Sequence, residues 1–184
     1  MKPRSSILRT APFIFILLTL LLLDGSGFAQ EPTELHSLKN QYQSVDLSTH
    51  EAERVKYILQ LVELLKTTGK RSHQMERAAD YKAVEAEINR HPYPANADSQ
   101  KLTKLLVGQW EGSRHSTEFR LNGTFEMIDG EPHGKWHIKG NELLKTYEGD
   151  SMPDAYRDTI ILITDKLLIL GDGDRVYLSN RIHQ

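Results

Sequence analysis

Histidines are the residues of this chain best suited to binding a metal, and His133 with His137 is the most promising pair. Gly134 and the alternating residues that follow it favour a strand over a helix here. On a strand, residues four apart share a face but stand about 13 Å apart at ~3.3 Å per residue. One zinc ion would need both ring nitrogens within about 2.0–2.1 Å. The sequence therefore predicts no metal site.

Other reactive constellations are incomplete. Asp172 and Asp174 flank Gly173, but the further oxygen ligands of a calcium loop are missing, and the fragment lacks the third glycine and following helix of a dinucleotide site. His50-Glu51 is followed by Arg54 where a zinc protease needs a second histidine, and no serine lies in a nucleophile elbow. We therefore expect a protein without catalytic residues or cofactor.

The first 29 residues have the order of a secretory signal. Lys2, Arg4 and Arg9 precede an apolar run that ends at Leu23, and small residues follow up to Ala29. The alternative, a retained membrane anchor, is disfavoured because residues 11–23 are 13 residues and a span needs about 20. We expect cleavage after Ala29 and a secreted or periplasmic protein that has no membrane segment after cleavage.

Removal of residues 1–29 takes away three basic residues and Asp24, which leaves 20 basic against 24 acidic residues and a formal charge of −4. A mildly acidic surface argues against nucleic acid or an anionic membrane as a partner. The chain contains no cysteine, so it has neither a disulfide framework nor a thiol nucleophile, and its core alone must stabilise it.

Residues 30–90 are rich in strong helix formers and predict a helical hairpin. A weak first helix is expected over 34–43. Thr49 is the expected N-cap of a second helix that ends at Gly69, and Ser72 the expected N-cap of a third. The short break between the second and third helices predicts that they are antiparallel. A partner-binding coiled coil is the alternative, but the apolar pattern lasts under three heptads.

The composition changes at residues 91–98, where two prolines and turn-forming residues predict a linker. A short helix over 99–107 follows, and short alternating runs then predict strands over 109–113, 115–121, 124–128, 134–139, 142–148, 156–164, 167–171 and 174–182. Asn122-Gly123 is the strongest hairpin signal in the chain, because both central positions of a type I′ turn need φ > 0.

Eight sequential strands joined by short turns predict a closed antiparallel barrel over residues 99–184, since closure removes exposed sheet edges. The fold class is therefore α+β, with helices before a meander barrel. Strand alternation places these residues on the inward face: Trp110, Phe119, Leu121, Phe125, Met127, Trp136, Ile138, Leu143, Ile160, Leu162, Leu168, Leu170, Val176 and Leu178.

The region after residue 99 resembles the lipocalin-like, or calycin, small barrels. The residues that carry the likeness are the lead-in 104–107, Gly108-Gln109-Trp110, the hairpin 119–125, the segment 134–138 and Arg181. The resemblance implies that Trp110 lies at the closed end of the barrel with Arg181 across its ring. Such a cation–π contact contributes about 0.5–2 kcal/mol, so Gly108, Trp110 and Arg181 form a structural signature.

Two functions stay open. The first is an exported, non-catalytic binding or interaction module with an unknown protein partner, because eight short strands leave an interior that side chains can fill. The second is a carrier of a small hydrophobic ligand, with Phe125, Trp136, Tyr147 and Tyr156 as the candidate binding residues beneath the loop 152–156. A cavity of at least ~300 Å³ lined by Phe125, Trp136 and Tyr147 would favour the carrier, and an exposed apolar face on the helices would favour the interaction module.

Overall fold

The computed structural model describes residues 31–71, 78–113, 115–128, 133–151 and 156–182. These residues belong to one compact unit, Glu31–Gln184. The expected signal segment and most of the loop 152–156 lie outside the described residues, as does Ser72, the expected cap of the third helix. No helix in the described ranges combines the length and apolar character needed to cross a membrane.

Four helices precede the strands in the described part of the chain: α2 (Thr33–Tyr42), α3 (Glu51–Arg71), α4 (Ala78–Asn89) and α5 (Ser99–Leu106). The expected boundaries of α3 are wrong at both ends. The Thr49 hydroxyl donates to the carbonyl of Asp46 and not to a helix terminus, and the helix begins at Glu51. Helix α3 also continues through Gly69, where a Cβ would stand 3.3 Å from the Tyr81 ring, so this glycine permits close approach of α4.

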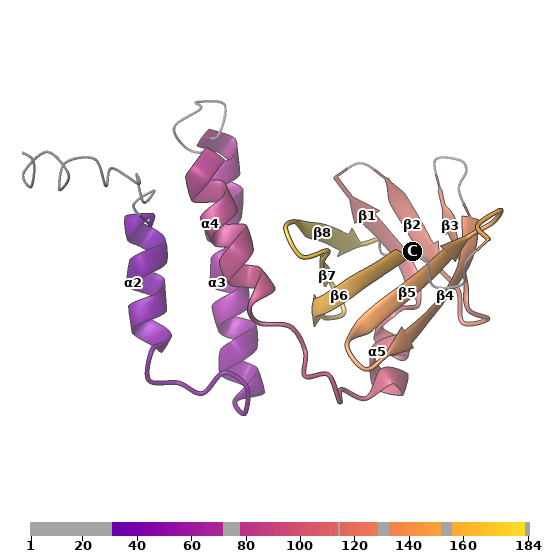
Figure 1. Ribbon diagram of the computed structural model, residues 1–184, viewed down its shortest axis with the longest axis horizontal. Coiled ribbons are helices and arrows are strands. Elements are labelled where there is room, and N and C mark those ends of the chain that lie inside the picture. The colour runs from indigo at the N-terminus through magenta and orange to yellow at the C-terminus, as the bar shows by residue number, and fades with distance from the viewer. Residues whose placement is uncertain (1–30, 72–77, 114, 129–132, 152–155, 183–184) are drawn as a thin grey trace, which may run out of the picture. The chain divides into compact units, whose positions relative to one another are not determined.

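The eight expected strands are confirmed, and Figure 1 shows them following the helices. They are β1 (Gly108–Gly112), β2 (Ser116–Phe119), β3 (Thr124–Met127), β4 (His133–Lys139), β5 (Glu142–Tyr147), β6 (Tyr156–Ile163), β7 (Leu167–Gly171) and β8 (Val176–Arg181). Each strand pairs antiparallel with the next, and β8 pairs with β1, so the sheet is a closed barrel. The α+β class and the closed antiparallel meander barrel are thus as expected.

Several expected inward positions are wrong. A register shift between Ile160 and Leu162 inserts an extra residue into β6, so Ile160 and Ile163 join the barrel core while Ile161 and Leu162 face outward. Val176 and Leu178 of β8 also pack outward, beneath the helices. Leu121 lies in the β2–β3 turn, after β2 has ended at Phe119, and is 77% exposed.

The outward residues of β6, β7 and β8 are buried because α2, α3 and α4 contribute to the same apolar core. Ile58 and Leu61 of α3 and Val84 and Ile88 of α4 belong to one cluster with the outward side chains Ile161, Leu162, Ile169 and Val176. Strand β7 and the second half of β6, from Ile160, are therefore buried on both faces, which explains why their sequences are continuous apolar runs.

Two buried polar side chains join the helices to the barrel. Arg54 of α3 is 3% exposed and donates to the backbone carbonyls of Ile161 and His91, each at 2.9 Å. Glu85 of α4 accepts the backbone N–H of Val176 at 3.1 Å. Burial raises the pKa of the Glu85 carboxyl group. These contacts orient the helices on the barrel more specifically than apolar packing alone.

Candidate functional site

One end of the barrel is closed by α5. Asp98 caps this helix by accepting the backbone N–H groups of Gln100 and Lys101, as expected for an aspartate at an N-cap. The apolar side of the helix follows, and Leu102 and Leu106 are buried among the inward side chains of the barrel. The helix therefore forms a floor, and a ligand would have to enter from the opposite end.

The signature residues Gly108, Trp110 and Arg181 meet at this floor. The Arg181 guanidinium lies 4.2 Å from the centroid of the Trp110 ring. It also donates to the carbonyl oxygens of Val107, at 2.8 Å, and Leu105. The Trp110 indole N–H donates to the carbonyl of Leu106 at 2.7 Å. Gly108 has φ +131°, and a Cβ there would stand 2.5 Å from the Arg181 Nη1 atom. The close approach of the Arg181 guanidinium to the backbone at residue 108 therefore requires glycine there.

A cavity of about 390 Å³ lies above this floor, inside the barrel. Its wall contains inward side chains from all the strands except β4. The lining residues are Trp110, Thr117, Phe119, Phe125, Met127, Lys145, Tyr147, Tyr156, Arg157, Asp158, Leu168, Leu170, Asp172, Tyr177 and Ser179. The inward side chains near α5 are packed into one buried cluster, and the cavity is open at the end of the barrel opposite this helix.

Three aromatic rings form one continuous wall of the cavity. Phe125 and Tyr147 meet edge to face with centroids 5.2 Å apart, and Tyr147 and Tyr156 do so at 4.7 Å. Edge-to-face pairs at these distances are favourable beyond the area they bury. The wall is therefore ordered before any ligand arrives, which lowers the entropic cost of binding.

An ion pair lies opposite apolar neighbours within the same cavity. The Lys145 Nζ atom of β5 stands 2.6 Å from the Asp158 Oδ2 atom of β6, and their side chains are 18% and 13% exposed. Both residues share the inward parity of their strands, since Leu143 pairs with Asp158 and Lys145 pairs with Tyr156. The cavity therefore offers one cation and one anion that largely neutralise each other.

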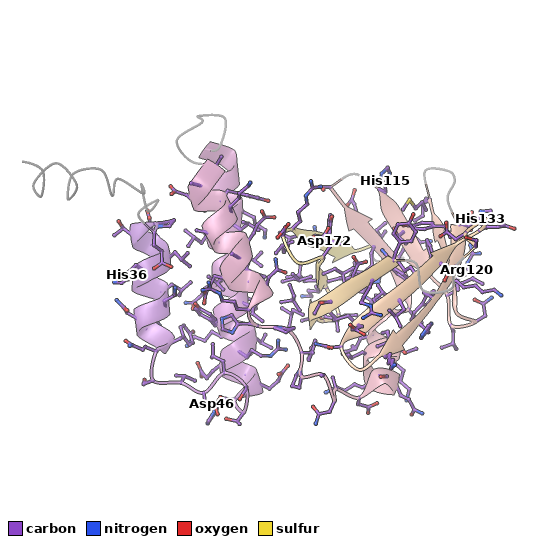
Figure 2. All side chains as sticks on the ribbon, in the orientation of Figure 1. His36, Asp46, His115, Arg120, His133 and Asp172 are labelled. Carbon is purple, nitrogen blue, oxygen red and sulfur yellow. The ribbon has the colours of Figure 1, made fainter. Side chains whose placement is uncertain are left out.

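Three large side chains are exposed at the end of the barrel where the cavity opens. Ile128, Tyr156 and Tyr177 are 46%, 48% and 41% exposed, and all three lie toward the barrel end opposite α5. The Tyr177 hydroxyl donates to Asp172 at 2.6 Å, which lowers the pKa of that carboxyl group and raises the pKa of the phenol. Asp172 is labelled in Figure 2, in the turn between β7 and β8.

Three of the four candidate ligand-binding residues line this cavity, namely Phe125, Tyr147 and Tyr156. Trp136 does not. Its ring packs edge to face against Phe119 at 5.6 Å, and its indole N–H donates to the carbonyl of Thr124 at 2.8 Å. Trp136 instead borders a surface groove beside α5, with Ser99 and Thr103. Trp136 therefore packs against the lining residue Phe119 without itself facing the cavity.

Lys145 and Asp158 were absent from the residues expected at the site, although the sequence carries a signal for them. Lys145 alternates with Leu143 and Tyr147, and Asp158 alternates with Tyr156 and Ile160. A charged residue at an inward position of a strand must find a partner in the interior. Two such positions of opposite charge on consecutive strands would have predicted the pair.

Within the ranges described, no group of three or more histidine, aspartate or glutamate side chains has the arrangement to hold a metal. His133 and His137 both lie on β4, as the alternation predicts, and His133 pairs with Glu148 in the turn that follows β5. Figure 2 labels His133 at the edge of the barrel. The geometry of β4 thus gives these two histidines no shared ion.

Comparisons with known proteins add little to this geometry. No protein-family model matches the chain, and no curated protein matches it. Among solved structures, the chain is similar to a lipocalin-like protein from Bacteroides uniformis, with 14% sequence identity and a TM-score of 0.35. The match covers 42% of this chain and 99% of that protein.

Proposed function

We propose that the protein binds a small, mainly apolar molecule in its barrel without transforming it. The observation that carries this proposal is the cavity of about 390 Å³. Eight-stranded barrels are either filled by side chains or hold one small ligand, and ligand pockets span about 300–1,000 Å³. The cavity is at the small end of that range, so the ligand is small as well.

The lining supports an apolar ligand. Trp110, Phe119, Phe125, Leu168 and Leu170 belong both to the lining and to the apolar core of the barrel, and such a surface favours transfer of a hydrocarbon group from water. Polar side chains among apolar ones orient a ligand in a small-molecule site, and the polar or charged residues of this lining, besides the tyrosines, are Thr117, Lys145, Arg157, Asp158, Asp172 and Ser179. Tyr156 and Tyr177 are exposed at the mouth, and each has an apolar ring and a polar hydroxyl group that an entering ligand can contact.

The helices favour this function over that of a protein-interaction module. Their apolar side chains are buried against one another and against the outward faces of β6, β7 and β8. Among the described helical residues, Leu59 is the one large hydrophobic side chain counted as exposed, at 41%. A single exposed leucine does not make a contiguous docking patch.

Export is part of the proposal and rests on the order of charged, apolar and small residues before Gln30. Expression of the full chain in a secreting bacterial host should yield a product that begins at Gln30. Intact-mass measurement of the fractionated protein tests this directly. A product that keeps residues 1–29 and sediments with membranes would contradict export and support a retained anchor.

Cavity binding is tested by filling the cavity. Ser179 points inward on β8, whereas its neighbour Asn180 is exposed on the outer face. Ser179 is paired with Gly112, which has no side chain, and it borders the cavity. We expect Ser179→Phe to weaken binding of an apolar fluorescent probe at least about tenfold, while Asn180→Phe leaves it unchanged.

Equal probe binding by both variants, with unchanged thermal unfolding, would place the probe outside the barrel and reject the proposed function. Native mass spectrometry of the mature protein from its own host complements this test. It should show a bound species of small mass that Ser179→Phe releases and Asn180→Phe retains.

A further inference from the structure

The ion pair between Lys145 and Asp158 is unusual for a cavity with mainly apolar walls, because each charge gives up hydration there. Burial of a charge is tolerated when a partner of opposite sign is close. At 2.6 Å the two groups satisfy this condition for each other. The intact pair therefore costs the folded protein little free energy. Removing one of the two charges would leave the other buried without a partner, which is costly.

The pair has unused hydrogen-bonding capacity. An ammonium group carries three N–H donors and a carboxylate about four acceptor sites, and their mutual contact uses only part of both sets. Both side chains line the cavity. A ligand group that accepts from Lys145 and donates to Asp158 can therefore add to the pair without breaking it.

The other charged residues of the lining are already engaged. Arg157 pairs with Glu142 at 3.1 Å, and Asp172 accepts from the Tyr177 hydroxyl at 2.6 Å. The charged lining side chains thus comprise two cations, Lys145 and Arg157, and two anions, Asp158 and Asp172. Among the described lining side chains each cation has an anionic partner, so an anionic ligand would meet no free counter-charge. A cationic ligand would find a carboxylate without a cationic partner only in Asp172, at the mouth, where the donor is the neutral Tyr177 hydroxyl.

Resting on the proposed function, we propose that the ligand is an uncharged amphiphile whose polar end both donates and accepts hydrogen bonds, such as an alcohol or a primary amide. Its polar end lies against Lys145 and Asp158, and its hydrocarbon part lies against the aromatic wall. At about 30 Å³ per water-sized group, the cavity holds about a dozen such groups, which suits a chain of about eight carbons.

The test uses three probes with the same chain: octan-1-ol, octanoate and octylammonium. Each competes with an apolar fluorescent probe for the mature protein at pH 7. For the wild-type protein we expect octan-1-ol to bind at least about tenfold more tightly than either ion. Equal or tighter binding of one ion would overturn the proposal.

Charge removal should then reverse the preference in a direction set by the residue changed. Asp158→Asn leaves Lys145 without its counter-charge, so octanoate should gain at least about tenfold in affinity. Lys145→Gln leaves Asp158 alone, so octylammonium should gain by a similar factor. Glu111→Gln and Lys139→Gln, both at exposed positions, change the net charge equally outside the cavity lining and should leave the order of the three probes unaltered.

A double variant covers the case in which a single substitution prevents folding. Lys145→Met/Asp158→Leu replaces the pair by apolar groups, a change that is often neutral or stabilising for a buried ion pair. It should still bind the apolar fluorescent probe but lose at least about tenfold in affinity for octan-1-ol. Unchanged octan-1-ol affinity would overturn the role of the pair.

The two hypotheses fail differently. If wild-type protein binds octan-1-ol in the cavity but neither single variant shifts the ranking of the ions, the uncharged-ligand proposal is wrong and cavity binding stands. If neither the fluorescent probe nor any eight-carbon probe binds the wild-type protein, the proposed function itself is wrong.

Discussion

Arg181, in the last strand, covers the ring of Trp110, in the first strand, at 4.2 Å, and the two residues are also paired in the sheet. The same guanidinium donates to two carbonyls at the start of β1 and the end of α5. One side chain therefore joins both ends of the barrel sequence and the helix that closes it.

Removal of this guanidinium should destabilise the barrel. Arg181→Ala loses the cation–π contact and leaves two carbonyl acceptors without their charged donor. We expect a loss of about 2–4 kcal/mol in the free energy of unfolding, measured by urea denaturation. Arg120→Ala removes an exposed guanidinium that pairs with Glu118 and Glu126, and should have little effect. Equal losses in both variants would contradict the role assigned to Arg181.

Gly108→Ala should lower the free energy of unfolding by more than the strain of a positive φ alone explains. Gly149 also has positive φ, at +96°, but a Cβ there meets nothing within 4 Å, so Gly149→Ala reports the backbone strain alone. That strain is about 1–2 kcal/mol. At Gly108 the added Cβ also displaces a guanidinium held by three contacts, so we expect at least about 1 kcal/mol more. The excess should shrink in an Arg181→Ala background, which urea denaturation of the double variant measures.

Arg54→Met should weaken the attachment of the helices to the barrel. The substitution keeps much of the apolar stem but leaves the carbonyls of His91 and Ile161 without their donor. It also removes the guanidinium 4.3 Å from the Tyr93 ring centroid. We expect a loss of about 2–5 kcal/mol in the free energy of unfolding. Lys56→Met, which breaks an exposed pair with Glu53, should cost under about 1 kcal/mol.

Glu87 should make stability fall in acid. A hydrogen bond with His91 and another from Tyr57, assisted by Lys39, lower the pKa of this buried carboxyl group to about 2. A lowered folded-state pKa contributes stability above the unfolded value of 4.5, and this stability is lost as pH falls toward 2. The contribution at neutral pH is about 3 kcal/mol. Glu87→Gln should therefore be less stable at pH 7, with the difference vanishing near pH 2.

Glu85 should change the pH dependence of stability in the opposite direction to Glu87. Burial raises the pKa of its carboxyl group, so the protonated form favours the folded protein and stability decreases as pH rises from about 4.5 through the raised pKa. Relative to the wild-type protein, Glu85→Gln should therefore gain stability over that range. Chemical denaturation of both variants from pH 2 to 7 measures the two trends, and parallel pH profiles would contradict both assignments.

The sequence by itself determined the strand order and the closure of the barrel. Turn residues such as Asn122-Gly123 act locally, and the contact between Trp110 and Arg181 follows once the strands pair in sequence. Alternation placed Phe125 on the inward face, because it depends on backbone geometry along a short regular strand alone. Tyr147 and Tyr156 were candidates only through their closeness to the mouth along the meander.

Tertiary structure decided what packs against the outer face of the barrel and how much space remains in its interior. Alternation assumes one buried face, but the helices cover β6, β7 and β8 from outside, so Leu162, Val176 and Leu178 are buried there. The extra residue in β6 turns the Leu162 side chain from the inner to the outer face of the sheet. No residue in this segment is of a type that predicts the bulge. The cavity volume is a small difference between the space enclosed by the whole barrel and the volume of its side chains, so no local segment of the sequence contains it.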